Sequence, residues 1–136
     1  MSEFIETIEQ AYQEPDNEVI VLKAHRLFLS HMFIMPVRKN ANKSDEPIPL
    51  FFTENKQHFL PIFTNDFLFR EWAGDNINQM DWLNLLGKDV VLGTGLNTYL
   101  CMDIGQNHYK EFDPSEIKRL QQVTLKVEKI ARAASK

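Results

Sequence analysis

The residues that most often do chemistry are few in this chain and far apart. The four histidines are His25, His31, His58 and His108, and no spacing among them matches a metal motif on a helix or hairpin. We expect each to be structural, although His31 and His58 both begin apolar segments and are candidates for cross-strand neighbours. A zinc site would need further ligands, and the one cysteine, Cys101, is remote from them in sequence. The sequence therefore predicts no metal and no cofactor.

Candidate nucleophiles are equally isolated. Cys101 lies between Leu100 and Met102 in an apolar segment, which favours a buried thiol, because reactive thiolates sit exposed near a base or a helix N-terminus. No serine lies in the G-x-S-x-G turn of hydrolases. One cysteine also excludes an internal disulfide, which is typical of a reducing compartment. These features favour a protein that is not an enzyme.

Two polar turns keep a ligand-binding alternative open. Gly93 to Gly95 lacks the lysine and the further glycines of a phosphate-binding loop, so we interpret it as a connection. Thr64 and Asn65 begin a helical segment and both are candidate caps. We predict that Thr64 is the cap and that Phe63 before it is buried. A small-ligand binder or enzyme that uses the loops around Thr64 and Asn97 is the alternative function.

The elements that must position these residues are organised around Ile48 to Phe63. We predict a central hairpin with strands at 48–53 and 58–63 and a polar turn at 54–57. Both strands are apolar at consecutive positions, which is typical of strands covered on both faces. Further extended segments are expected at 31–37, 97–104 and 109–112.

Helices are predicted where apolar residues recur with a period of about 3.6. The expected ranges are 4–14, a second helix capped by Asp16 or Asn17, a third from Thr64 to Gly74, a fourth at Met80 to Leu86, and a C-terminal helix. In the third helix Leu68 and Trp72 are expected on the buried face. Asp89 to Leu92 is compatible with either a strand or a helix.

The C-terminal helix has the clearest start signal. Asp113 is the expected N-cap, Pro114 occupies the first helical position, and Glu116 completes a capping box. An apolar stripe follows at Leu120, Val123, Val127, Ile130 and Ala134. We therefore predict a single α+β domain over residues 1–136, with a small mixed or antiparallel sheet around the hairpin, flanking helices and a long C-terminal helix.

Composition narrows the function classes. Hydrophobic residues make up 43% of the chain and charged residues 25%, which is typical of a globular protein. The formal net charge of −4 argues against nucleic acid as the main partner. The N-terminal ten residues lack the pattern of a signal peptide, and no apolar run reaches the ~20 residues of a membrane span. We expect a cytoplasmic protein.

Charge is distributed unevenly along the chain. The first 18 residues hold six acidic residues and no basic one, whereas six basic residues and Glu128 follow Ile117. One interpretation is two solvated helix faces, which could also pair with each other. The other is a docking surface, in which residues 124–136 project as a helical tail that binds a protein partner or a second copy. The partner-binding residues would then be Val127, Ile130, Ala134, Lys126, Lys129 and Arg132.

Several short motifs resemble one bacterial family. They are Leu60 to Thr64 (LPIFT) with Trp72 a few residues on, His31 to Val37 ending in Pro36-Val37, and Tyr109 to Ile117 (YKEFDPSEI). In this order and spacing, over roughly residues 14–125, the chain resembles the N-terminal domain of the SseB protein family. The resemblance implies a bacterial accessory or interaction domain without catalytic activity. An adaptor or immunity-type protein of a secretion or toxin system is the alternative.

Because no set of clustered cysteines and histidines is present, we predict that folding requires no metal. Thermal unfolding with and without a strong chelator should give the same midpoint. A midpoint lowered by several degrees in the chelated sample would show that a bound metal contributes to the fold.

Overall fold

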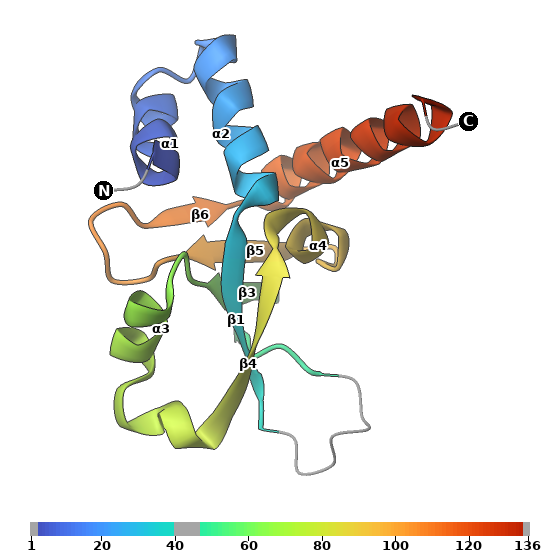
Figure 1. The fold of residues 1–136 in the computed structure, drawn as a ribbon. Coiled ribbons are helices and arrows are strands. Elements are labelled where there is room, and N and C mark those ends of the chain that lie inside the picture. The colour runs from blue at the N-terminus through green and yellow to red at the C-terminus, as the bar shows by residue number, and fades with distance from the viewer. Residues whose placement is uncertain (1–2, 40–46, 135–136) are drawn as a thin grey trace.

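Two β-sheets with helices around them make up the structure, a computed structural model that describes residues 3–39 and 47–134 (Figure 1). The predicted α+β class is confirmed. In chain order the elements are α1 (Glu3–Gln13), α2 (Glu18–Ser30), β1 (Met32–Arg38), β2 (Phe52–Glu54), β3 (Gln57–Ile62), α3 (Asp66–Ala73), the 3-10 helix η1 (Gly74–Gln79), β4 (Met80–Leu86), α4 (Gly87–Leu92), β5 (Thr98–Met102), β6 (Lys110–Phe112) and α5 (Pro114–Ala134).

Strand β3 connects the two sheets. The first sheet has the order β2-β3-β5-β6, in which β3 runs parallel to β5 and the other pairs are antiparallel. Past the end of β3, Phe63 exchanges two backbone hydrogen bonds of 2.9 Å with Ile34 of β1, which belongs to the second sheet. Pro61 is tolerated between these partners because β2 ends at the level of Phe59, so no neighbouring strand needs its missing N–H.

The second sheet consists of β1 and β4, which pair in antiparallel register from Met32–Leu86 to Arg38–Met80. The predicted helix at Met80 to Leu86 is therefore wrong. Leu83 and Leu86 have helical spacing, but the segment alternates with a period of two: Leu83 and Leu85 pack against the core, whereas Trp82 and Asn84 are exposed. This alternation, weakened by Leu86, is the pattern of a half-buried strand.

The central hairpin is shorter than predicted. Only Phe52–Glu54 pairs with β3, at the edge of the sheet, and all of β2 is exposed, so the expectation of two covered faces is wrong for this strand. The preceding residues instead bond β1: Ile48 accepts from the Arg38 N–H, and Leu50 donates to the Pro36 carbonyl. Pro47 and Pro49 remove two donors from this stretch, which limits it to isolated bridges.

The larger core cluster lies among the two sheets and the helices α1, α2, α4 and α5. Phe28, Phe33, Ile62, Leu100 and Leu120 are at most 1% exposed within it. Asn17 caps α2 as expected, since its side chain accepts from the Ile20 N–H. A smaller cluster surrounds Phe63, which is fully buried as predicted.

Helix α3 buries Phe69 and Ala73 in this smaller cluster, whereas the predicted pair, Leu68 and Trp72, contacts the cluster only at its margin. Trp72 is 38% exposed and Leu68 is half-buried. Asn65, not Thr64, caps the helix, since the Asn65 side chain accepts from the Leu68 N–H at 2.9 Å. Gly74 ends α3 with φ +52°, as the sequence predicts.

Residues 89–92, left open by the sequence, are helical and belong to α4, which buries Val90 and Val91. The helix begins directly against the end of α2. A Cβ at Gly87 would lie 1.9 Å from the Phe28 carbonyl oxygen, so only glycine fits between the two backbones.

The C-terminal helix begins with the predicted capping box. The Asp113 side chain accepts from the Glu116 N–H at 2.9 Å, and Glu116 accepts from the Asp113 N–H at 3.5 Å. The Glu116 N–H and the Ser115 hydroxyl bond the Asp113 carboxylate and lower its pKa. Ile117, Leu120 and Thr124 are buried, and beyond Thr124 the helix extends away from the other elements (Figure 1).

Replacing Gly87 by alanine should lower the free energy of unfolding by at least about 1–3 kcal/mol, because the added methyl group forces α2 and α4 apart. Gly95→Ala is the matched control, since a Cβ there meets no atom within 4 Å. Its effect should stay within about 0.5 kcal/mol. Equal effects of the two substitutions in urea unfolding would contradict the close approach.

Candidate functional site

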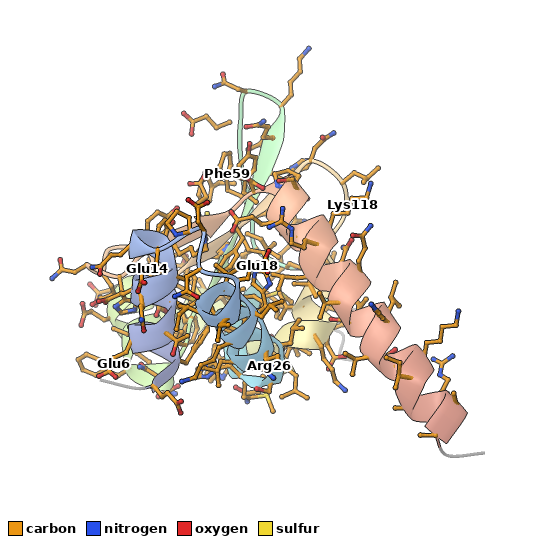
Figure 2. The ribbon with its side chains drawn as sticks, turned by 90° about the horizontal axis from the view of Figure 1, so that it is seen from above. Glu6, Glu14, Glu18, Arg26, Phe59 and Lys118 are labelled. Carbon is orange, nitrogen blue, oxygen red and sulfur yellow. The ribbon has the colours of Figure 1, made fainter. Side chains whose placement is uncertain are left out.

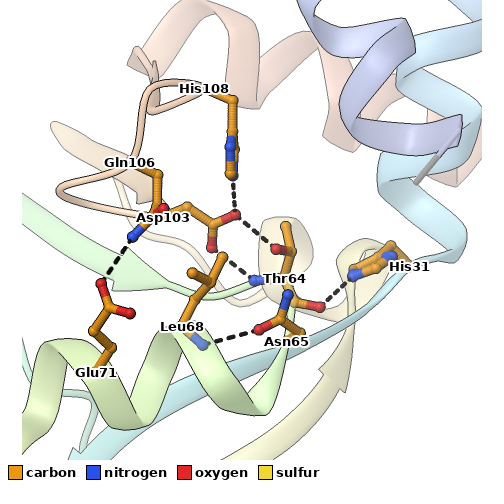
Figure 3. A network of polar contacts seen from close by, with 8 residues as sticks. All are labelled: His31, Thr64, Asn65, Leu68, Glu71, Asp103, Gln106 and His108. Atoms are coloured by element: carbon orange, nitrogen blue, oxygen red, sulfur yellow. Dashed lines mark hydrogen bonds and ion pairs between the residues drawn. The ribbon is translucent and has the colours of Figure 1, made fainter. Parts of the chain in front are cut away.

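The most concentrated set of polar contacts centres on Asp103, directly after β5 (Figure 3). Its carboxylate is fully buried and accepts three hydrogen bonds: from the Thr64 N–H at 2.8 Å, the Thr64 hydroxyl at 2.6 Å and His108 Nε2 at 2.6 Å. The Asp103 backbone has φ +58°, a left-handed conformation that aspartate adopts more readily than most residues. The buried charge is therefore compensated by donors from two separate segments.

The prediction that Thr64 caps α3 is wrong, and the network explains its role. Thr64 is 9% exposed and its hydroxyl is committed to Asp103, while the neighbouring Asn65 performs the capping. On the other side, His31 Nε2 donates to the Thr64 carbonyl at 2.8 Å. The turn between β3 and α3 is thus held from β5 and from the start of β1 (Figure 3).

The network orients a histidine but assembles no reaction centre. His108 uses Nε2 for Asp103, an arrangement that fixes the ring as in Asp–His pairs of hydrolases. The Thr64 hydroxyl donates to the same carboxylate and is therefore not available to His108 as a nucleophile. Among residues 3–39 and 47–134, no three His, Cys, Asp or Glu side chains form a group that could hold a metal ion. We interpret the cluster as structural: it connects the turn after β3 to the end of β5.

The two loops proposed as an alternative ligand site do not meet. Because β3 and β5 are parallel, Thr64 follows the end of one strand while Asn97 precedes the start of the other. Gly93 to Gly95 line a separate hollow of about 210 Å³ beside His58. His58 contacts Thr53 and Phe51, and His31 contacts Thr64, so the two histidines are not cross-strand neighbours.

Cys101 lies in the sheet as predicted, at 1% exposure. Burial raises the pKa of its thiol above the ordinary value. Burial, followed by the contact with Cys101 and the bond to Glu111, also raises the pKa of Tyr109. Both groups stay protonated at neutral pH, which excludes a nucleophilic thiolate in this environment.

A mixed cavity of about 310 Å³ lies among α1, α2, β6 and α5. Lys110 Nζ crosses it, 4.4 Å from the centre of the Tyr12 ring and 3.0 Å from a Glu116 carboxylate oxygen. His25 lines the same cavity, and burial, followed by the charge of Arg119, lowers its pKa. The histidine is therefore neutral at pH 7 and supplies no charge for an anionic ligand.

The third hollow is predominantly apolar and lies beside the projecting helix. It has a volume of about 410 Å³ and is bounded by the end of α2, the junction of β4 and α4, and α5. Leu29, Leu86, Val123 and Val127 supply its apolar walls, with charged side chains at the rim. Beyond it, Val127 and Ile130 are each 60% exposed on one face of α5. The sequence-predicted partner-binding residues thus lie on an uncovered part of the helix.

The acidic and basic ends of the chain lie on different sides of α2. Figure 2 shows Glu6 and Glu14 on α1, Glu18 at the start of α2, and Lys118 on α5 beyond it. Glu3 of α1 pairs with Lys23 of α2 at 2.9 Å, and Arg132 lies 3.9 Å from Glu128 within α5. Lys126, Lys129 and Arg132 are exposed on the projecting turns, which makes that end of the molecule basic.

Comparisons of the chain with models of protein families, with curated proteins and with solved structures find no match. The described residues include no helix that is both long enough and apolar enough to span a membrane.

The Asp103 network predicts that Thr64→Val lowers the free energy of unfolding more than Asn65→Ala, which removes the cap of α3. Losing a hydrogen bond to a buried charge should cost about 1.5–3 kcal/mol, whereas Asn65→Ala should cost about 1 kcal/mol. Thr64→Val and Asp103→Asn should be coupled by at least about 0.5 kcal/mol in a double-mutant cycle followed by urea unfolding. Strictly additive effects would mean that the two side chains do not interact in solution.

Proposed function

We propose that the protein is a non-enzymatic interaction domain that docks a protein partner on the projecting part of α5 and the adjoining groove. The supporting observation is the exposure of Val127 and Ile130, at 60% each, on a helix whose preceding turns are firmly buried. An apolar stripe that continues past the domain core is typical of a helix that is covered by another chain.

The groove extends the same surface. Val127 belongs both to the exposed stripe and to the wall of the apolar groove, so a partner could contact the two without a break. Leu29 and Leu86 form the opposite walls. A hollow flanked by an exposed apolar helix face offers the buried anchor pocket and the surrounding rim that protein interfaces commonly contain.

Charge indicates the chemistry of the partner. Arg26 and Lys88 line the groove together with Glu128, and Lys126 borders the stripe on α5. Lys129 and Arg132 add positive charge on the opposite face of the same turns. A partner with an apolar segment bordered by acidic residues would be complementary, and rim charges of this kind mainly increase the association rate.

The proposed role agrees with the resemblance to the SseB N-terminal domain, and we extend the proposal to a bacterial, cytoplasmic accessory protein of that kind. The commitment of the Thr64 hydroxyl to the Asp103 carboxylate that also binds His108, and the protonated state of Cys101, support a binding role over a catalytic one.

The docking surface is tested in the full-length chain with Val127→Glu combined with Ile130→Glu. Leu125→Glu is the matched control, because Leu125 is 55% exposed but lies on the opposite face of the helix. A partner captured from native lysate by the unchanged protein and identified by mass spectrometry should bind the double variant at least about tenfold more weakly. Leu125→Glu should bind it normally.

Thermal unfolding of the three proteins decides whether the stripe is external. The midpoints should agree, since exposed side chains contribute little to the folded state. A double variant that melts several degrees lower would place the stripe in the core, and unchanged capture by all three proteins would move the docking site elsewhere.

A further inference from the structure

Within residues 3–39 and 47–134, the backbone N–H and C=O groups on the outer edge of β4 have no partner. Ile34, Pro36 and Arg38 of β1 direct their backbone polar groups away from β4, toward Phe63 and residues 48–50. Backbone polar groups alternate along a strand, so Phe33, Met35 and Val37 bond β4 through their register partners Asp81, Leu83 and Leu85.

The intervening residues of β4, Trp82 and Asn84, must therefore direct their N–H and C=O groups to the side opposite β1. Within residues 3–39 and 47–134, no strand lies on that side, and β4 ends its sheet (Figure 1). Trp82 is 37% exposed and Asn84 is also exposed, in agreement with an open edge.

The edge of β4 lacks the sequence features that normally prevent edge strands of different molecules from pairing. Natural edge strands are short, bulged, or carry proline and lysine. The strand has seven residues, MDWLNLL, with no proline or lysine, and Asp81 is its only charged residue. The outer strands of the other sheet, β2 and β6, have three residues each. A long, apolar and unprotected edge indicates that β4 pairs with another strand in the functional form of the protein.

We propose that β4 pairs with β4 of a second copy of the chain, in antiparallel register about a two-fold axis at Leu83. Trp82 of each copy then lies opposite Asn84 of the other, and these two residues exchange the outward-pointing hydrogen bonds. Met80 lies opposite Leu86. The result is a four-stranded sheet with the order β1-β4-β4-β1 across the two copies.

Two features favour a second copy in this orientation: the position of the Asp81 charge, and the far side of β1, which has no room for a further strand. Parallel pairing in register would place Asp81 against Asp81, which is repulsive, whereas antiparallel pairing places it opposite Leu85. The far side of β1 is already bonded to Phe63 and residues 48–50, so pairing stops at two copies.

The inference concerns an edge that the proposed α5 docking surface does not include. Leu86 is the one strand residue that lines the groove beside α5. The Val127→Glu and Ile130→Glu variant therefore serves as a control, which should keep the two-fold pairing while losing the other partner.

Amide hydrogen exchange measured by NMR tests the pairing directly. In a monomer, the Leu83 and Leu85 amides are protected by β1, whereas those of Trp82 and Asn84 exchange freely. In the proposed dimer all four are protected, and protection of Trp82 and Asn84 should disappear on dilution. The alternation within one strand is an internal control. If Trp82 and Asn84 exchange freely at every concentration, the proposal is wrong.

Asn84→Pro removes one outward-pointing N–H without removing a bond to β1, so the monomer should fold. Sedimentation should show a dimer for the natural protein and for Asn84→Ala, and a monomer for Asn84→Pro. A monomeric natural protein, or a dimer that survives Asn84→Pro, would overturn the proposal. If Asn84→Pro fails to fold, the concentration-dependent exchange of the unchanged chain decides the matter.

Discussion

The buried carboxylate of Asp103 is the constraint on which the arrangement of the other elements depends. A charge without solvent is costly unless donors surround it, and here all three come from the turn after β3 and from His108. The requirement fixes the end of β3 relative to the end of β5, and with it the direction in which α3 leaves the sheet. His31 extends the same constraint to the start of β1 through the Thr64 carbonyl.

The division of the strands into two sheets follows from the backbone hydrogen bonds on the edge of β3 that faces away from β5. Phe59 bonds the short strand β2, Pro61 offers no donor, and Phe63 bonds Ile34 of β1. One strand therefore changes partners along its length, and β1 continues beyond the contact to pair with β4. The segment between β3 and β5 supplies both the helix α3 that covers Phe63 and the strand β4 that covers one side of β1.

Local signals in the sequence predicted much of this fold. The caps at Asn17 and Asp113, the stop at Gly74, the extended segments around 31–37 and 97–104, and the buried Phe63 and Cys101 all depend on neighbouring residues. The errors concern elements whose state is set by distant partners. The spacing of Leu83 and Leu86, three residues apart, predicts a helix at β4, and only pairing with β1 makes the period-two pattern decisive. The local sequence predicts a capping role for Thr64 because the true partner of its hydroxyl, Asp103, is 39 residues away. The one local signal for Asp103 is an acidic residue directly after an apolar strand.

The turns of α5 beyond Thr124 also have a thermodynamic consequence. Their side chains are mostly exposed, so little tertiary burial supports the helical state there. Helices of fewer than about 12–15 residues are marginal in water on their own, and residues 125–134 depend on continuity with the anchored turns before them. We therefore expect this end of the helix to fray more readily than its anchored turns. A partner that binds the stripe must select the helical form, and its affinity will increase with any substitution that raises intrinsic helix propensity in these turns without touching the interface.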